Sequence, residues 1–111
     1  MLITDEQIIE SLNILSSRCH YNSKNKGFWD DLDPESPIVQ LAKLMLIDTE
    51  SAEAAEAVRK GDKENLGEEL ADIIIRVMDL AYAKRIDIGQ AVMDKMKANA
   101  KRPKMHGGKL A

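Results

Sequence analysis

The sequence predicts an all-α protein built as a four-helix, bundle-like subunit. Apolar residues recur at helical spacing in four segments, and no segment alternates apolar and polar residues for long enough to indicate a strand. Most of these segments are also bounded by residues typical of helix ends. The chain has 111 residues, so we expect a single domain spanning 1–111.

The first predicted helix follows Thr4, and Gln7 three residues later fits a capping box. Its apolar stripe comprises Ile8, Ile9, Leu12, Leu15 and Cys19. Residues 22–35 are polar and rich in turn formers, which predicts a loop. Phe28 and Trp29 stand out in that loop, because they are half of the protein's four aromatic residues.

The second and third helices are predicted to form a close antiparallel pair. The second begins at Ser36-Pro37, a cap followed by proline at the first helical position, and runs to about Lys60. Gly61 then provides a stop. The third begins near residues 62–65 and ends near residue 84 or 85. Such a short connection places the two helices side by side.

The fourth predicted helix begins at Asp87, with Gln90 three residues later. It continues until Pro103 prevents further helix, because proline lacks the backbone N–H and clashes with the preceding turn. Residues 104–111 are predicted to form a mobile tail.

Composition narrows the classes of function. A formal net charge of −3 gives no reason to expect a nucleic acid or a membrane as partner. A single cysteine, Cys19, excludes an intrachain disulfide framework and a Cys-based zinc cluster, and it favours a reducing compartment. The N-terminus lacks the features of a secretory signal, and the longest apolar run, residues 44–47, is too short to span a bilayer. We therefore expect a cytoplasmic protein.

Two pairs of acidic residues carry the functional prediction. Glu50 and Glu53 lie three apart on the second predicted helix, and Glu69 and Asp72 lie three apart on the third. Successive helical residues turn by about 100°, so Glu53 continues a line of apolar residues. Because the first half of that helix is apolar on every side, we expect it to be buried all round. The two acidic pairs are then predicted to meet between the helices.

Four carboxylates in one partly buried space repel one another and lose hydration. Protonation, basic partners or a divalent cation would relieve this. Arg76 is placed to pair with Asp72 one turn away, but one arginine cannot neutralise four acids. Mg²⁺ prefers oxygen ligands, and Mn²⁺ is a possible substitute. An acidic helix face is more often simply solvated, so the spacing by itself leaves both interpretations open.

Several phrases in order along the chain resemble the MazG-like, all-α nucleoside triphosphate pyrophosphatases. They are KGFWDD, ESAE, GEELAD and KMKANAKRP, followed by KRPKMHGGK, and the resemblance spans about residues 20–108. It implies that Glu50, Glu53, Glu69 and Asp72 are catalytic residues that bind Mg²⁺. The implied reaction cleaves a (deoxy)nucleoside triphosphate between its α and β phosphates, as nucleotide-pool house-cleaning. It also implies a homodimer or homotetramer whose subunits complete one another's pockets.

The resemblance also suggests substrate-binding residues. Lys95, Asn99 and Arg102 share one face of the fourth predicted helix and are expected to hold phosphates, although the two cations would also suit a helix C-terminus. Trp29 is expected to stack on the base, with a local core position as the alternative. Glu56 is an outer member of the acidic group in this interpretation.

The sequence departs from the family pattern at two points, and other functions are alternatives to this interpretation. Thr49 stands where family members often have glutamate, and the tail lacks the aromatic residue expected in close relatives. Phosphoribosyl-ATP pyrophosphohydrolase and a non-catalytic helical interaction module remain alternatives. A di-iron bundle requires Glu-x-x-His pairs, and the sequence has none. His20 and His106 are interpreted as incidental.

Overall fold

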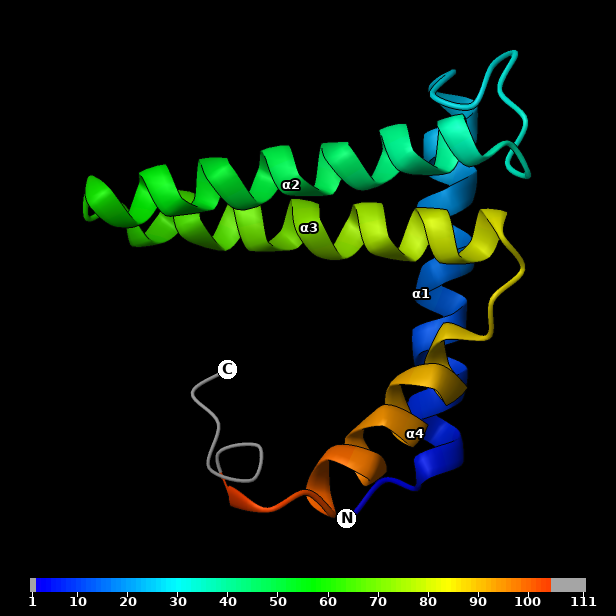
Figure 1. The fold of residues 1–111 in the computed structure, drawn as a ribbon, viewed down its shortest axis with the longest axis vertical. Coiled ribbons are helices and arrows are strands. Elements are labelled where there is room, and N and C mark those ends of the chain that lie inside the picture. The colour runs from blue at the N-terminus through cyan, green and yellow to red at the C-terminus, as the bar shows by residue number, and fades with distance from the viewer. Residues whose placement is uncertain (1, 105–111) are drawn as a thin grey trace.

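The computed structural model describes residues 2–104, and four helices account for most of them (Figure 1). They are α1 (Asp5–Asn25), α2 (Pro37–Arg59), α3 (Lys63–Ala83) and α4 (Ile88–Ala100). The described part of the chain contains no strand. The predicted all-α class with four helices is therefore confirmed. The tail predicted to be mobile lies, apart from Lys104, outside the described residues.

The helix starts form as the sequence predicts. Thr4 and Gln7 make the reciprocal capping box before α1, with hydrogen bonds of 2.8 and 3.1 Å. Asp62 and Asp87 cap α3 and α4 by accepting hydrogen bonds from backbone N–H groups three residues ahead, at 3.0 and 2.9 Å. Gly61 adopts a φ of 67° in the turn between α2 and α3, a conformation that glycine takes without strain.

The end of α1 differs from the prediction, because the helix continues through residues 22–25, which were expected to be loop. These polar residues add a solvated final turn and need no apolar face. The chain leaves the helix at Gly27, whose φ is 86°.

The helices form two packed pairs instead of one closed bundle (Figure 1). The α2/α3 hairpin projects sideways from one end of α1, and only α3 of this hairpin crosses α1. The other end of α1 packs against α4, which runs antiparallel to it: Asn13 of α1 bonds Asp87 at 2.8 Å, and Lys97 pairs with Asp5 at 3.2 Å. Among the described helices, α2 packs along α3 alone.

Small side chains allow the close helix crossings. Ser16 of α1 is 2% exposed and donates a 2.6 Å hydrogen bond to the carbonyl oxygen of Met78 in α3. Gly89 of α4 lies against Ile9, where an added Cβ would come within 2.8 Å of the Ile9 Cα atom. On α2, Ala54 and Ala57 are buried against α3, as expected for closely packed helices.

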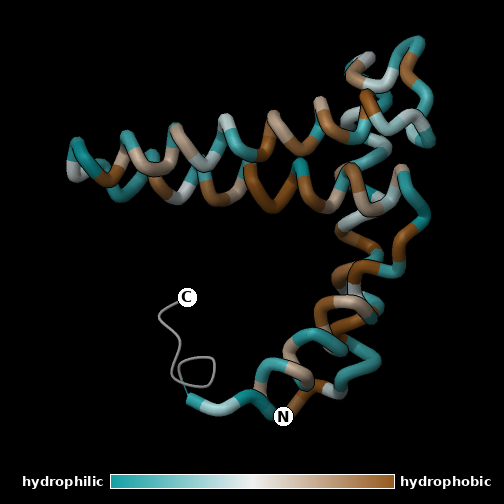
Figure 2. The backbone as a smooth tube through the Cα atoms, viewed as in Figure 1, coloured by the Kyte–Doolittle hydropathy of each residue, from teal (hydrophilic) through white to brown (hydrophobic). Residues whose placement is uncertain are grey.

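The first half of α2 is exposed within one chain, where the sequence predicted burial all round. Figure 2 shows hydrophobic residues along α2 and α3, whereas the connection between these helices is hydrophilic. Ile38 is 79% exposed and Met45 is 62% exposed. The exposed large apolar residues of the hairpin also include Leu41, Leu44, Leu46, Val58, Leu70, Ile74 and Ile75. Burial on every side of α2 therefore requires more than this chain's own helices.

Candidate functional site

Three of the four predicted carboxylates converge between α2 and α3. Glu50, Glu69 and Asp72 each offer an oxygen, and the three oxygens lie within 4.8 Å of one another. Glu69 and Asp72 share a face of α3 because they are three residues apart, and the antiparallel hairpin brings Glu50 of α2 opposite them. We call these three carboxylates the acidic cluster.

Glu53, the fourth predicted acid, is exposed and lies at the border of the acidic cluster. It is close enough to act on the ionisation of both Glu50 and Glu69. Glu56, suggested as an outer member, instead forms solvent-exposed ion pairs with Arg59 at 3.6 Å and Lys60 at 4.0 Å. The acidic group therefore ends at Glu53 on α2.

The acidic cluster has fewer partners than its burial requires. Glu50 is only 7% exposed, and its Oε2 atom is buried with no hydrogen-bond partner among the described residues. The same holds for Oε2 of Glu69. An unpaired buried carboxylate oxygen is costly, because it has given up hydration without replacement. Two such atoms beside a third carboxylate fit a hard divalent cation, whose preferred ligands are carboxylate oxygens.

Arg76 is the cation that contacts the acidic cluster. Its Nε donates a 3.1 Å hydrogen bond to Oε1 of Glu50, across the two helices. The sequence had suggested Asp72, one turn away on α3, as its partner. Glu50 is more deeply buried than Asp72, so its charge has more to gain from a nearby guanidinium.

The close approach of the carboxylates shifts the pKa values of Glu50 and Glu69 in opposite directions. The acceptor oxygens of Glu50 and then Glu53 raise the pKa of Glu69 to about 7, because a protonated Glu69 can donate to them. Burial opposes ionisation of Glu50, but a protonated Glu69 that donates to it, the Arg76 guanidinium and Glu53 together more than offset this, and the pKa of Glu50 lies below its usual value. The cluster therefore holds a proton near neutral pH when it holds no metal.

This shift predicts how the metal-free protein responds to pH. Because the pKa of Glu69 is higher in the folded protein than in the unfolded chain, folding takes up a proton between about pH 4.5 and 7. The free energy of unfolding should then fall as pH rises through that range. Chemical denaturation in EDTA at pH 5, 6, 7 and 8 measures this, and excess Mg²⁺ at pH 8 should restore the lost stability.

The matched control for this titration is Glu69→Gln, which cannot take up the proton. Its free energy of unfolding should change less with pH than that of the wild type over the same range. Equal pH dependence in the two proteins would show that Glu69 does not carry the raised pKa.

A cleft adjoins the acidic cluster. Two neighbouring cavities, of about 340 and 310 Å³, are both bordered by Ser23, Phe28, Arg76 and Asp79. Lys43 and Leu46 also line the first, and Lys26 and Asp72 also line the second. We call this space the Phe28 cleft. Asp72 lines the cleft as a member of the acidic cluster, and Arg76 lines it while contacting Glu50, so a molecule in the cleft would touch the cluster.

Trp29 contacts two residues of the cleft wall without lining the cleft itself. It is 7% exposed, its Nε1 donates a 2.9 Å hydrogen bond to Asp79, and the ammonium of Lys43 lies 4.3 Å from its ring centroid. His20 Nδ1 lies 2.9 Å from the same Asp79 oxygen. Phe28, the neighbouring aromatic residue, is 60% exposed and lines the cleft.

Sequence reasoning assigned no role to Asp79, Lys43 or Phe28. The available signal for Asp79 was its position on the polar arc of α3 that also carries Glu69, Asp72 and Arg76. His20, interpreted as incidental, is packed beside Tyr82 and Trp29 through ring contacts. His106 lies outside the described residues.

The predicted phosphate-binding residues lie apart from the acidic cluster in a single chain. Lys95 and Asn99 are exposed on α4, and Arg102 is exposed just beyond it. This helix packs mainly along α1, away from the middle of the α2/α3 hairpin (Figure 1). One chain therefore does not bring these three residues to the acids.

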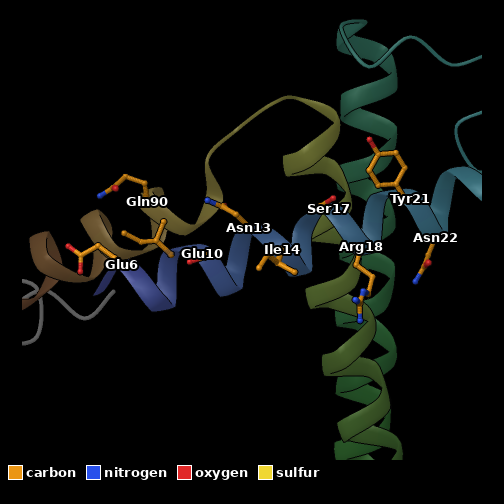
Figure 3. A pocket seen from close by; sticks show the side chains of 10 residues that line it. Glu6, Glu10, Asn13, Ile14, Ser17, Arg18, Tyr21, Asn22 and Gln90 are labelled. Carbon is orange, nitrogen blue, oxygen red and sulfur yellow. The ribbon is translucent and has the colours of Figure 1, made fainter. Parts of the chain in front are cut away.

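A wider groove elsewhere on the described surface is a different feature. A groove of about 810 Å³ runs along α1, and Figure 3 shows Glu6, Glu10, Ile14 and Arg18 lining it. None of the members of the acidic cluster borders it. The chemistry suggested by the acidic cluster thus belongs to the smaller Phe28 cleft.

None of the described helices combines the length and the apolar character that crossing a bilayer requires.

Comparison with known proteins identifies the family. The family model for the MazG nucleotide pyrophosphohydrolase domain matches residues 40–105, which is more than half of the chain. The matched region includes all four predicted acids, Arg76 and the whole of α4. The comparisons with curated proteins and with solved structures each found no match. The chain belongs to the MazG nucleotide pyrophosphohydrolase family.

Proposed function

We propose that this protein hydrolyses (deoxy)nucleoside triphosphates between the α and β phosphates, releasing a monophosphate and pyrophosphate. The observation that carries the proposal is the acidic cluster, with its two buried and unpartnered oxygens, beside the Phe28 cleft. Membership of a nucleotide pyrophosphohydrolase family supports the reaction class. Removal of unwanted or excess nucleotides is the corresponding cellular role.

Glu50, Glu69 and Asp72, with Glu53 beside them, are the residues that would hold Mg²⁺, with Mn²⁺ as substitute. Such an ion, when bound, screens the triphosphate charge and makes a bound water more acidic. A carboxylate oxygen that does not bind the ion accepts the proton of the attacking water.

The cleft supplies the other contacts. Lys26, Lys43 and Arg76 line its two cavities and attract a polyanionic substrate. We assign the contact with the base to Phe28, because this ring is exposed within the cleft. Trp29 would support the site indirectly, since it is buried against Lys43 and Asp79. Direct stacking on Trp29, as the resemblance implies, would require Lys43 to move.

We further propose that the active form is a homodimer or homotetramer. Many large apolar residues of α2 and α3 are exposed in one chain, and a second copy would bury them. The second copy would also supply Lys95, Asn99 and Arg102, which one chain holds away from its own acids. Most soluble oligomers are homo-oligomers with closed symmetry, in which the same face of each copy can be buried.

A nucleotide panel tests this function. The protein is incubated with Mg²⁺ and each common (deoxy)nucleoside triphosphate, or with phosphoribosyl-ATP, and monophosphate, pyrophosphate and inorganic phosphate are measured separately. We expect monophosphate and pyrophosphate in equal amounts from at least one triphosphate, and none in EDTA. Release of inorganic phosphate would contradict the cleavage position, and turnover of phosphoribosyl-ATP alone would indicate the related reaction.

A further inference from the structure

Arg76 lies at the boundary between the acidic cluster and the Phe28 cleft. Its Nε donates a hydrogen bond to Oε1 of Glu50 at 3.1 Å. The side chain of Arg76 is 38% exposed, and that of Glu50 is 10% exposed. The guanidinium therefore extends from a buried carboxylate towards open space. Both cavities of the cleft are bordered by this residue.

The terminal nitrogens of Arg76 have no hydrogen-bond partner within the described part of the chain. A guanidinium carries five N–H donors in a planar fork, and only the Nε donor is used here. Burial lowers the pKa of Lys43 across the cleft; the charge of Asp79 opposes this shift, and the charge of Arg76 adds to it. Lys43 and Arg76 both line the first cavity, where Asp79 is the one acid beside them among the described residues, so two cations against one acid still favour an anion there.

The charge balance of the acidic cluster changes when a metal ion binds. In the metal-free protein, Arg76 is the positive side chain in contact with Glu50. A divalent ion at the unpartnered oxygens of Glu50 and Glu69 would weaken the attraction between Glu50 and Arg76, because the carboxylate charge is then shared. The guanidinium would be left beside a substrate with several phosphate oxygens, which its fork binds in a bidentate manner.

We propose that Arg76 is a shared cation, which neutralises Glu50 in the metal-free protein and binds a phosphate group of the substrate in the loaded enzyme. This inference rests on the proposed function. It makes Arg76 a catalytic residue from the same chain as the acidic cluster, separate from the cations of α4. It also predicts that Arg76 and the metal ion compete for the charge of Glu50.

Arg76→Gln and Arg76→Lys test the inference, with Arg59→Gln as the matched control. Arg59 also pairs with a glutamate of α2, but in solvent. For each protein, calorimetry and thermal unfolding measure binding of Mg²⁺ alone, and steady-state kinetics at saturating Mg²⁺ give kcat and KM. Circular dichroism confirms the helix content of every variant.

Arg76→Gln should bind Mg²⁺ at least as tightly as the wild type, and its melting temperature should rise more on adding Mg²⁺, because the competing cation is gone. Its kcat/KM should fall about 100-fold, the scale seen when one charge-stabilising donor is removed. Arg76→Lys keeps the charge, so its Mg²⁺ affinity should match the wild type, yet kcat/KM should remain at least tenfold low because an ammonium lacks the fork. Arg59→Gln should change neither property.

Weaker Mg²⁺ binding in Arg76→Gln would overturn the inference, since Arg76 would then support the metal site. Turnover within threefold of the wild type in both Arg76 variants would overturn it as well. These outcomes leave the proposed function intact, provided that the wild type binds Mg²⁺ and releases pyrophosphate. A wild type that does neither would overturn the proposed function and this inference with it.

Discussion

Replacing Glu69 by glutamine is expected to lower kcat/KM by a factor on the order of 10³ while leaving the metal-free fold at least as stable as the wild type. The amide preserves the shape of the side chain but removes one of the three converging carboxylates. The remaining acids would hold Mg²⁺ poorly, and the reaction depends on that charge. Stability should not suffer, because the pKa of Glu69 is raised first by donation to Glu50 and Glu53, which an amide N–H can also provide, and then by burial and by repulsion that glutamine lacks.

The measurements are pyrophosphate release and thermal unfolding at pH 8, with and without Mg²⁺. Glu68→Gln is the matched control, because Glu68 precedes Glu69 on α3 but is exposed and outside the acidic cluster. It should keep normal turnover and a normal Mg²⁺-dependent rise in melting temperature, and Glu69→Gln should lose both. Full activity in Glu69→Gln would contradict the assignment of this residue to the metal site.

The acidic cluster was predictable because its geometry is mostly local. The three-residue spacing of each pair fixes the face of the helix, and the short connection of residues 60–62 fixes the antiparallel register. Helix starts were predictable for the same reason, since Thr4 and Asp62 cap residues only three positions away. The structure of these features is determined by residues close together in the sequence.

Other features depend on contacts between distant segments. Arg76 pairs with Glu50, 26 residues away, because Glu50 is buried. Helical periodicity shows only which residues of the same helix are neighbours, so it pointed to Asp72 instead. Trp29 is held by Asp79 from another helix, and nothing in the loop sequence indicates that hydrogen bond. The exposed apolar start of α2 shows a further limit: an apolar sequence predicts burial, but the surface that covers it can belong to another chain.

The assembly proposal leads to a second large effect, the recovery of activity from two inactive variants. Glu69→Gln removes a cluster acid, and the double variant Lys95→Ala/Arg102→Ala removes the two α4 cations. Each should be nearly inactive alone. If each pocket combines the acids of one subunit with α4 of its partner, a mixed dimer has one doubly defective pocket and one intact pocket. Random mixing should then recover about a quarter of wild-type activity in a two-fold dimer.

Co-expression with two different affinity tags gives the mixed dimers, and native mass spectrometry measures their fraction. The control mixes Glu69→Gln with a chain carrying all three substitutions, since no pairing of those chains yields an intact pocket. If α4 instead reached the acids of its own chain, every pocket in the first mixture would contain a defect, and mixed dimers would stay inactive. The exposed position of α4 and the distance of its cations from the cluster within one chain therefore make recovery the expected result.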